Sequence, residues 1–518
     1  MTNSNEEETM NASNLKYKKP TENSEIIDKD NVEVKYLSNS NEHVREIQIL
    51  TPADCVRKKD TLFLYFVVLT GTMSVIVGAG SFVWTSPVVP KLISNNTDEN
   101  PIGRPATTTE ISLIAGLPFL TMIFGSFLLG SLSEMVGRKR CLQFIGLGMF
   151  VSAVIVAFST NVIFIIIFRC VLFMFYNGVL TVYPIYLTEI CEDHNRAKYG
   201  CLMGVFLPFG NLYSYILGSF FNVRSYSLLL AAPLAYFLVF FFFAPESPVY
   251  SSIKGHREES LRALKKLRNN KTRDEITEDY DKISNTIRKR SAKMSILEIL
   301  RDGDLRYGMI LALGPVLVQN LSGVTIVMAF MAPIFNAAGF SGNYMSIIVG
   351  AIKVITITCT SFVVEKTGRR KMLFTSAIGT GFPLLILGIF FYLQNIDSPL
   401  IKHVQWLPLP CVICNVVMYS VGLGPIPMAI MSELFVPEVR SVAVSIVTAL
   451  MGFCIFITTT SYPFMVEILG IHWCVWMYSC VCFLGAVFIY FVIPETKGKS
   501  LLQIQQYLKT RNFNQDLL

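Results

Sequence analysis

The sequence predicts an all-α membrane protein with twelve transmembrane helices in two pseudo-symmetric six-helix halves. Composition is the first reason: 52% of the 518 residues are hydrophobic, only 16% are charged, and the mean hydropathy is +0.49. Soluble domains carry about a quarter charged residues, so this chain is too apolar to be one. The second reason is a series of uncharged stretches, each long enough to cross about 30 Å of hydrocarbon. The third is a set of motifs that occurs twice in the same order.

Twelve apolar stretches define the domain organisation. We expect the spans at 62–84, 111–131, 141–159, 162–188, 200–221, 226–244, 308–330, 343–364, 372–394, 404–432, 442–466 and 473–493. This predicts a disordered cytoplasmic N-tail (1–60), an N-terminal six-helix bundle (61–244), a cytoplasmic helical linker (245–306), a C-terminal six-helix bundle (307–493) and a cytoplasmic C-tail (494–518). The polar N-tail has no apolar core of the kind found in a cleavable signal peptide.

Lysine and arginine are distributed unevenly between the two sides of the membrane. With both termini inside, the outer loops carry only Lys91, Arg104, Arg224 and Lys402, and nearly all of the 44 lie on the inner side. Such an excess marks cytoplasmic loops, so the sequence predicts cytoplasmic termini. The sequon Asn95-Asn96-Thr97 then falls in the first outer loop, where we expect glycosylation at Asn95.

Three motifs are repeated between the halves. Glu134-Met-Val-Gly-Arg-Lys139 after the second span matches Glu365-Lys-Thr-Gly-Arg-Arg370 after the eighth, Glu189 with Arg196 after the fourth matches Glu433 with Arg440 after the tenth, and Pro245-Glu246-Ser247 after the sixth matches Pro494-Glu495-Thr496 after the twelfth. Internal repeats with a substrate site between them, near the midplane, are typical of secondary transporters. The repeats therefore predict two homologous halves around a shared site.

The sequence lacks the residues that metalloenzymes, disulfide-rich proteins and ATP-driven pumps require. The twelve cysteines are scattered, mostly within apolar stretches, and the five histidines fall outside the spans, so we expect neither a disulfide framework nor an intramembrane metal site. Gly498-Lys499-Ser500 resembles the end of a phosphate-binding loop, but Ile493 stands where that loop needs glycine. We therefore predict no enzyme activity, no cofactor and no metal ion. The net charge of +7 gathers on the inner face, which favours a lipid bilayer over nucleic acid as partner.

The linker carries a helical pattern in which Leu261, Leu264 and Leu267 recur among Lys and Arg. This predicts a solvated amphipathic helix lying under the bundle. A polybasic site for lipid or a protein partner is the alternative.

Charged side chains gather at the inner ends of the spans. Those for which we predict a gating or salt-bridge role are Glu134, Arg138, Glu189, Arg196 and Glu246 in the first half and Glu365, Arg369, Glu433, Arg440 and Glu495 in the second. We predict the same role for Arg169, within the fourth span. One exposed pair contributes less than about 1 kcal/mol, but a set can bias a two-state equilibrium of a few kcal/mol. We predict ion-pair networks that hold the halves together when the inner side is closed. Separately solvated charges are the alternative.

Five sequence motifs point to one family. They are Gly130-Ser-Leu-Ser-Glu-Met-Val-Gly-Arg-Lys139, Pro245-Glu-Ser-Pro-Val-Tyr250, Gln319-Asn-Leu-Ser-Gly323, Gly424-Pro-Ile-Pro427 and Pro494-Glu-Thr-Lys-Gly498. Together they resemble the sugar porters of the major facilitator superfamily, over roughly 60–505. Trp84-Thr-Ser-Pro87 and Phe209-Gly-Asn211 are similar to the insect facilitated trehalose transporters. The resemblance implies the major facilitator fold, alternating access, and a hexose or a disaccharide such as trehalose as substrate.

The resemblance and the polar residues of the spans suggest a substrate site. Its predicted members are Gln319, Asn320, Ser322, Thr325, Lys353, Asn415, Tyr419 and Met428. Gln319 and Ser322 share one helical face because they are three residues apart. Several positions differ from the family pattern. The family has glutamine at Leu207 and at Asn320, and asparagine at Thr325. It has tryptophan at Met428 and an asparagine-tryptophan pair at Met451-Gly452. Hydrogen bonding between neighbouring helices is the alternative role for these polar side chains.

Two cations lie inside the spans. Lys353 is near the bilayer centre, where a side chain of roughly 6 Å cannot reach an interface about 15 Å away. It either contacts substrate in a water-filled cavity or donates to backbone carbonyls. Arg169 stands at the family's arginine, but the first span has no carboxylate of the kind that partners it in proton-coupled members.

We therefore predict a plasma-membrane facilitator that moves a sugar down its gradient. A facilitator of another small solute, such as an organic anion, is one alternative, and a sensor that binds sugar without moving it is the other.

Overall fold

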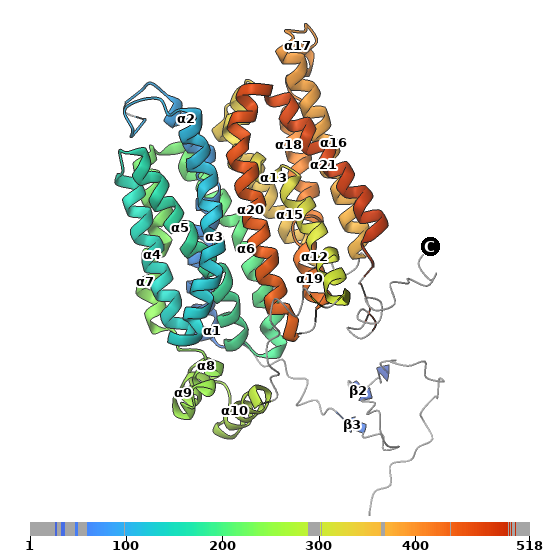
Figure 1. Cartoon of the computed structure of the whole chain (residues 1–518). Coiled ribbons are helices and arrows are strands. Elements are labelled where there is room, and N and C mark those ends of the chain that lie inside the picture. Colours follow the sequence, from blue (N-terminus) through green and yellow to red (C-terminus); the bar gives the residue numbers. More distant parts are fainter. Residues whose placement is uncertain are drawn as a thin grey trace, which may run out of the picture. The chain divides into compact units, whose positions relative to one another are not determined.

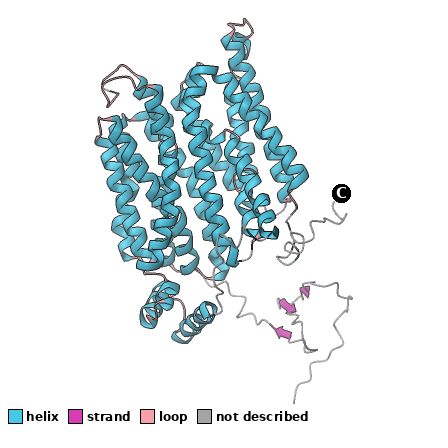
Figure 2. Ribbon diagram, viewed as in Figure 1, coloured by secondary structure: helices cyan, strands magenta, loops and turns pink. Residues whose placement is uncertain are grey.

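The computed structural model describes residues 60–97, 99–288, 303–363, 368–435 and 437–495, three short strands within 26–49, and the single positions 301, 497, 499 and 503. Within these residues, twelve helical segments are long and apolar enough to cross a membrane, which confirms the predicted number. The helices fill the bundle drawn in cyan in Figure 2.

The first six spans are formed by the helices labelled in blue to light green in Figure 1. They are α1 (Leu62–Phe82) continued by α2 (Thr85–Ile93), α3 (Thr108–Val136), α4 (Arg138–Phe158), α5 (Val162–Ile190), α6 (Asp193–Phe220), and α7 (Val223–Phe240) followed by the 3-10 turn η2 (Phe241–Phe243). Polar side chains fix where helices begin. Thr107 and Glu110 form a capping box at the start of α3, and the Asn161 side chain accepts from the Ile163 backbone N–H at the start of α5.

The linker and the second half follow the same plan. The linker contains α8 (Pro248–Ile253), α9 (Arg257–Leu267) and α10 (Arg273–Arg288). The second half contains α12 (Gly303–Leu321), α13 (Val324–Ala329), α14 (Met331–Ala337), α15 (Gly342–Val363), α16 (Arg369–Asn395), the short α17 (Ile401–Val404), α18 (Pro408–Val421), α19 (Ile426–Leu434), α20 (Pro437–Leu469) and α21 (Ile471–Val492). Gly323, with a φ of 80°, separates α12 from α13 in the seventh span.

Three strands lie in the segment for which we predict disorder. β1 (Ile26–Ile27), β2 (Glu33–Tyr36) and β3 (Ile47–Ile49) form an antiparallel sheet in the order β1-β2-β3, with Val34 opposite Ile26 and Ile49. β-branched residues favour strands, and they break the otherwise polar composition at these positions. The rest of 1–59 lies outside the described residues, as does most of the C-tail.

Helix packing is repeated between the two halves. In the first half α1 packs on α6, α4 on α7, and α3 on α5; in the second α12 packs on α20, α16 on α21, and α15 on α18. The halves meet through α3 with α20 and α6 with α15. These helices are the second (α3), eleventh (α20), fifth (α6) and eighth (α15) spans. A pseudo-twofold axis exchanges the second span with the eighth and the fifth with the eleventh, so it converts one contact into the other. The packing therefore confirms two pseudo-symmetric halves.

Small residues allow the first half to pack closely. Gly71 and Gly78 on α1 face Tyr183 and Tyr176 on α5, leaving no space for a Cβ atom at either glycine. The Tyr183 hydroxyl donates to the carbonyl oxygen of Val68 (2.8 Å), so α1 and α5 are also joined by a hydrogen bond. Close approach at small residues is a common way of packing membrane helices.

Candidate functional site: the charged clusters and the contact between the halves

Two charge clusters lie at the ends of the spans that are predicted to face the cytoplasm. In the first half, Arg138 opens α4, and its Nε and Nη2 donate to the Glu189 carboxylate at 3.1 and 3.2 Å. The Ser247 hydroxyl also donates to Glu189 (2.5 Å). Glu246 accepts from the backbone N–H groups of Lys139 (2.9 Å) and Ser247 (2.9 Å), so its carboxylate lies at the positive N-terminal end of α4.

The second half repeats this cluster. Arg369 opens α16 and pairs with Glu433 of α19 at 3.1 Å. Glu495 accepts from the backbone N–H groups of Arg369 (2.8 Å) and Arg370 (3.2 Å), as Glu246 does at α4. The repeated motifs of the sequence therefore fold into equivalent contacts.

These described pairs join helices of the same half. Arg138 with Glu189 connects the third span to the fourth, and Arg369 with Glu433 connects the ninth to the tenth. The reason is that α4 packs directly on α5, and α16 on α18 and α19. A role in holding the two halves together stays a prediction, because in each of these pairs both partners lie in one half.

Four further residues at span ends were predicted to have a gating or salt-bridge role. Glu134 and Arg196 are exposed at the ends of the second and fifth spans. Glu365 and the side chain of Arg440 lie outside the described residues. Asn95, the predicted glycosylation site, is exposed in the loop after α2.

Hydrogen bonds between the halves gather near the ends of the spans opposite the charge clusters. The Thr85 hydroxyl donates to the carbonyl oxygen of Ala329 (2.8 Å), and the Tyr215 hydroxyl donates to that of Met328 (2.9 Å). Three more such contacts are Ala332 N–H to the Ser86 hydroxyl, the Ser219 hydroxyl to the Asn343 carbonyl oxygen, and the Ser112 hydroxyl to the Thr460 carbonyl oxygen. The two halves are therefore in direct contact at this end of the bundle, which is the end predicted to face outward.

Arg169 is enclosed within the first half. Its guanidinium lies 4.4 Å from the centre of the Trp84 ring and 5.4 Å from that of Phe173, and its Nε donates to the carbonyl oxygen of Ile114 (3.2 Å). Only 3% of the residue is exposed. Aromatic faces stabilise a desolvated cation, so these contacts replace the carboxylate expected in proton-coupled members.

The seventh span places its polar residues in different surroundings. Gln319 donates from Nε2 to the Gly424 carbonyl oxygen (2.8 Å) beside the Tyr419 hydroxyl, and its Oε1 is buried without a hydrogen-bond partner among the described residues. The Asn320 amide donates to the Val316 carbonyl oxygen, and the Ser322 hydroxyl to that of Gln319, both within the same helix. Thr325 is buried in α13. Among these described side chains, only that of Gln319 donates to another span.

The predicted site residues of the tenth span are enclosed by neighbouring side chains. Asn415 is buried and donates to the Thr380 carbonyl oxygen of α16 (3.0 Å), which is the alternative role of bonding neighbouring helices. Tyr419 is half-buried and packs against two apolar clusters, and Met428 packs against one of them.

Lys353 lies where α15 of the second half meets α6 of the first. Its ammonium donates to the thioether sulfur of Met328 (3.0 Å). With the Asn211 amide oriented so that its nitrogen donates to the Ala79 carbonyl oxygen (2.7 Å), its oxygen accepts from Lys353 at 3.0 Å. Asn211 and Met328 were not predicted as site residues. The Phe209-Gly-Asn211 motif was the available signal for Asn211, but nothing in sequence spacing places it beside Lys353.

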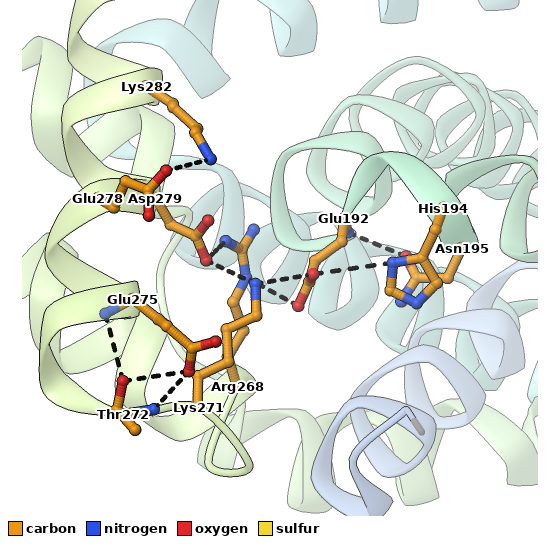
Figure 3. A network of polar contacts seen from close by, with 10 residues as sticks. All are labelled: Glu192, His194, Asn195, Arg268, Lys271, Thr272, Glu275, Glu278, Asp279 and Lys282. Carbon is orange, nitrogen blue, oxygen red and sulfur yellow. Dashed lines mark hydrogen bonds and ion pairs between the residues drawn. The ribbon is translucent and has the colours of Figure 1, made fainter. Parts of the chain in front are cut away.

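The linker is fixed to the first half by a network that the sequence analysis missed (Figure 3). Lys271 lies 2.9 Å from Glu192, at the start of α6, and 2.8 Å from Asp279 of α10. Arg268 lies 2.5 Å from Asp279 and 3.5 Å from Glu192. Both cations keep less than a tenth of their side-chain surface exposed. In addition, the Thr61 hydroxyl donates to the Leu267 carbonyl oxygen (2.7 Å).

The network changes the titration of Asp279. Burial alone would raise the pKa of this carboxyl, but the hydrogen bonds and positive charges of Lys271 and Arg268 outweigh burial and hold the pKa below its ordinary value. The linker predicted as a solvated amphipathic helix is therefore docked through buried charges as well as through Leu264 and Leu267.

Comparisons with solved structures match this fold. The inward open conformation of the xylose transporter XylE from E. coli has a TM-score of 0.72 and 20% identity, over 86% of this chain and 99% of that one. A partially occluded inward open conformation of the same protein has a TM-score of 0.69, over 85% and 100%. At this identity, the likeness shows the fold alone.

Sequence comparisons identify relatives and a family. Proteins named facilitated trehalose transporter Tret1 are 28% identical in Culex quinquefasciatus, over 91% of this chain and 90% of the relative, and 29% identical in Bombyx mori, over 86% of each. The Drosophila sechellia relative, Tret1-1, is 29% identical over 85% of this chain, which spans about half of that relative's length (51%). The family model described as "Sugar (and other) transporter" matches residues 63–508, so the chain belongs to this transporter family.

Proposed function

We propose that this protein moves a sugar, a hexose or a disaccharide such as trehalose, down its gradient by alternating access. The observation that carries the proposal is the pseudo-twofold pair of bundles, which meet through two equivalent helix pairs and are hydrogen-bonded to each other at one end. Transporters built from such repeats bind substrate between the halves near the midplane. The names of the mosquito and silkworm relatives support a sugar as the substrate.

Gln319 and Lys353 are the strongest candidates for sugar contact. Gln319 offers a buried acceptor oxygen that a sugar hydroxyl can fill, and Lys353 lies between the halves. An unfilled buried acceptor is costly, so a substrate hydroxyl bound there is favoured. Asn320, Ser322 and Asn415 already donate to backbone carbonyl oxygens, which supports an indirect role for them.

Uptake by purified protein in liposomes tests the proposal. We expect accumulation of labelled trehalose or glucose to the external concentration and no further, with counterflow when the liposomes are preloaded. Replacing Gln319 by leucine should lower the rate up to about tenfold, the equivalent of one hydrogen bond. Saturable sugar binding without any flux would instead indicate a sensor and would contradict the proposal.

Transport should not depend on a proton gradient. The described contacts of Arg169 are two aromatic rings and a carbonyl oxygen, and the first span contains no carboxylate that could exchange a proton with substrate movement. At a fixed sugar gradient, the initial rate should stay within about twofold when an imposed pH difference of one unit is collapsed with an ionophore. A rate that falls with the pH difference would show proton coupling.

We also propose a plasma-membrane location with both termini in the cytoplasm. The exposed Asn95 then faces the outside, and Asn95→Gln should increase gel mobility as much as enzymatic removal of N-linked glycans does. Because the change is confined to an outer loop, uptake per molecule at the cell surface should be unchanged. Equal mobility of the variant and the untreated wild type would count against the predicted topology.

A further inference from the structure

Lys353 lies far from either membrane surface. It is midway along α15 (Gly342–Val363), so it is about 15 Å from either end at a rise of 1.5 Å per residue. Its side chain cannot span that distance, and the ammonium therefore stays at the depth of the bilayer centre. A cation at this depth is costly unless charged or strongly polar groups surround it.

Among the described spans, none has a carboxylate at that depth. The acidic residues of the twelve spans are Glu110, Glu134, Glu189 and Glu467, and each is within three residues of a span end. The described partners of Lys353 are the neutral Asn211 oxygen and the Met328 sulfur, which is a weak acceptor. These two acceptors are neutral, so they do not balance the positive charge of the ammonium. They also use only two of its three N–H donors, and the third can bind another group.

Lys353 also lies at the contact between the two halves. Its contacts join the two halves, since Asn211 belongs to α6 of the first half and Met328 to α13 of the second. The lysine is half-buried, whereas Arg169, the other cation within the spans, is 3% exposed and covered by two aromatic rings. Arg169 is thus fixed within one half, while Lys353 lies on the surface that parts when the halves rock.

We propose that Lys353 is a specificity-determining residue that selects sugars bearing a carboxylate, such as a hexuronate, over neutral sugars. The carboxylate supplies the negative charge that the spans lack at this depth, and its oxygens accept from the ammonium. Hydrogen bonds between ionised partners are roughly twice as strong as those between neutral groups. The remaining hydroxyls bind as in a neutral sugar, so this inference rests on the proposed function.

Competition between two labelled substrates in liposomes tests the inference. Initial rates for glucuronate and glucose are measured with the membrane potential held at zero by valinomycin and equal potassium, because only glucuronate carries a charge. We expect the wild type to favour glucuronate at least tenfold and Lys353→Gln to lower this ratio at least tenfold. Lys353→Arg, which keeps the charge, should retain most of the preference. Lys402→Gln removes a lysine from an exposed outer loop and should leave the ratio unchanged.

A glucuronate-to-glucose ratio that Lys353→Gln leaves unchanged, or a wild type that prefers glucose, would overturn the inference while leaving sugar transport in place. If neither sugar crosses the membrane, the proposed function fails, and calorimetric titration with glucuronate decides the inference separately. Binding to the wild type but not to Lys353→Gln would support it, and equal or absent binding would refute it.

Discussion

Replacing Gly116 by tryptophan should reduce transport at least about 100-fold by preventing closure of the outer side. Gly116 lies on α3 of the first half, and a Cβ atom there would come within 2.9 Å of the Thr460 backbone nitrogen on α20 of the second half. An indole cannot fit at that distance, and overpacking by even a few atoms costs about 1–3 kcal/mol. Shifting a two-state equilibrium from 99:1 to 1:99 takes about 5.5 kcal/mol. An indole adds many more atoms than such a minor overpacking, and its nearest neighbour is backbone, so we expect the clash to accumulate the outward-open state.

The measurement combines uptake with accessibility. Ser112, whose hydroxyl donates to the Thr460 carbonyl oxygen, is covered in the closed state and is replaced by cysteine in both backgrounds. In intact cells, an impermeant maleimide should label it faster with Gly116→Trp than without. Phe124→Trp, at a 58% exposed position of the same helix, is the matched control and should transport normally. Wild-type rates for Gly116→Trp would show that α3 and α20 do not form an outer gate.

The sequence is sufficient for the fold because the bilayer leaves few choices. An apolar stretch of about twenty residues has to cross as a helix, since its backbone hydrogen bonds are satisfied there only within the segment. All twelve spans were therefore predictable, and the repeated motifs predicted the two halves. Breaks within spans were harder to predict. Gly323, at positive φ, separates α12 from α13, although the apolar sequence continues across this position.

Contacts between distant segments were harder to predict. The equivalence of Glu246 and Glu495 followed from the repeats, but the structure shows each accepting from the first N–H groups of a neighbouring helix of its own half. Lys353 was identified by its depth alone, while its partner Asn211 is set by how α15 crosses α6. Glu192 and Asp279 carry no sequence signal, because a carboxylate in a polar loop or linker usually faces water.

The linker network should fail when one of its two cations is removed. Lys271→Met leaves Glu192 and Asp279 sharing Arg268, at a site where the side chains of both acids are about a fifth exposed or less. Removing one partner from a buried ion pair costs about 3–5 kcal/mol. We expect a loss of about 3 kcal/mol in the free energy of docking α9 and α10, seen as much faster trypsin cleavage within 257–288 and faster hydrogen exchange there.

Charge balance separates this explanation from a loss of packing. Lys271→Met combined with Asp279→Asn removes one charge of each sign and should recover most of the protection, whereas a packing defect would persist. Arg262→Met breaks an i,i+4 pair with Glu258 that is more than three-quarters exposed, so its effect should stay within about 1 kcal/mol.

The stability of the docked linker should also depend on pH, with a definite sign. The network lowers the pKa of Asp279, so its contribution is complete above the ordinary value near 4 and is lost as the pH falls further. Acid should therefore accelerate hydrogen exchange in the wild-type linker relative to the intrinsic exchange rate at the same pH, and it should do so less in the double variant, which has already lost this carboxylate.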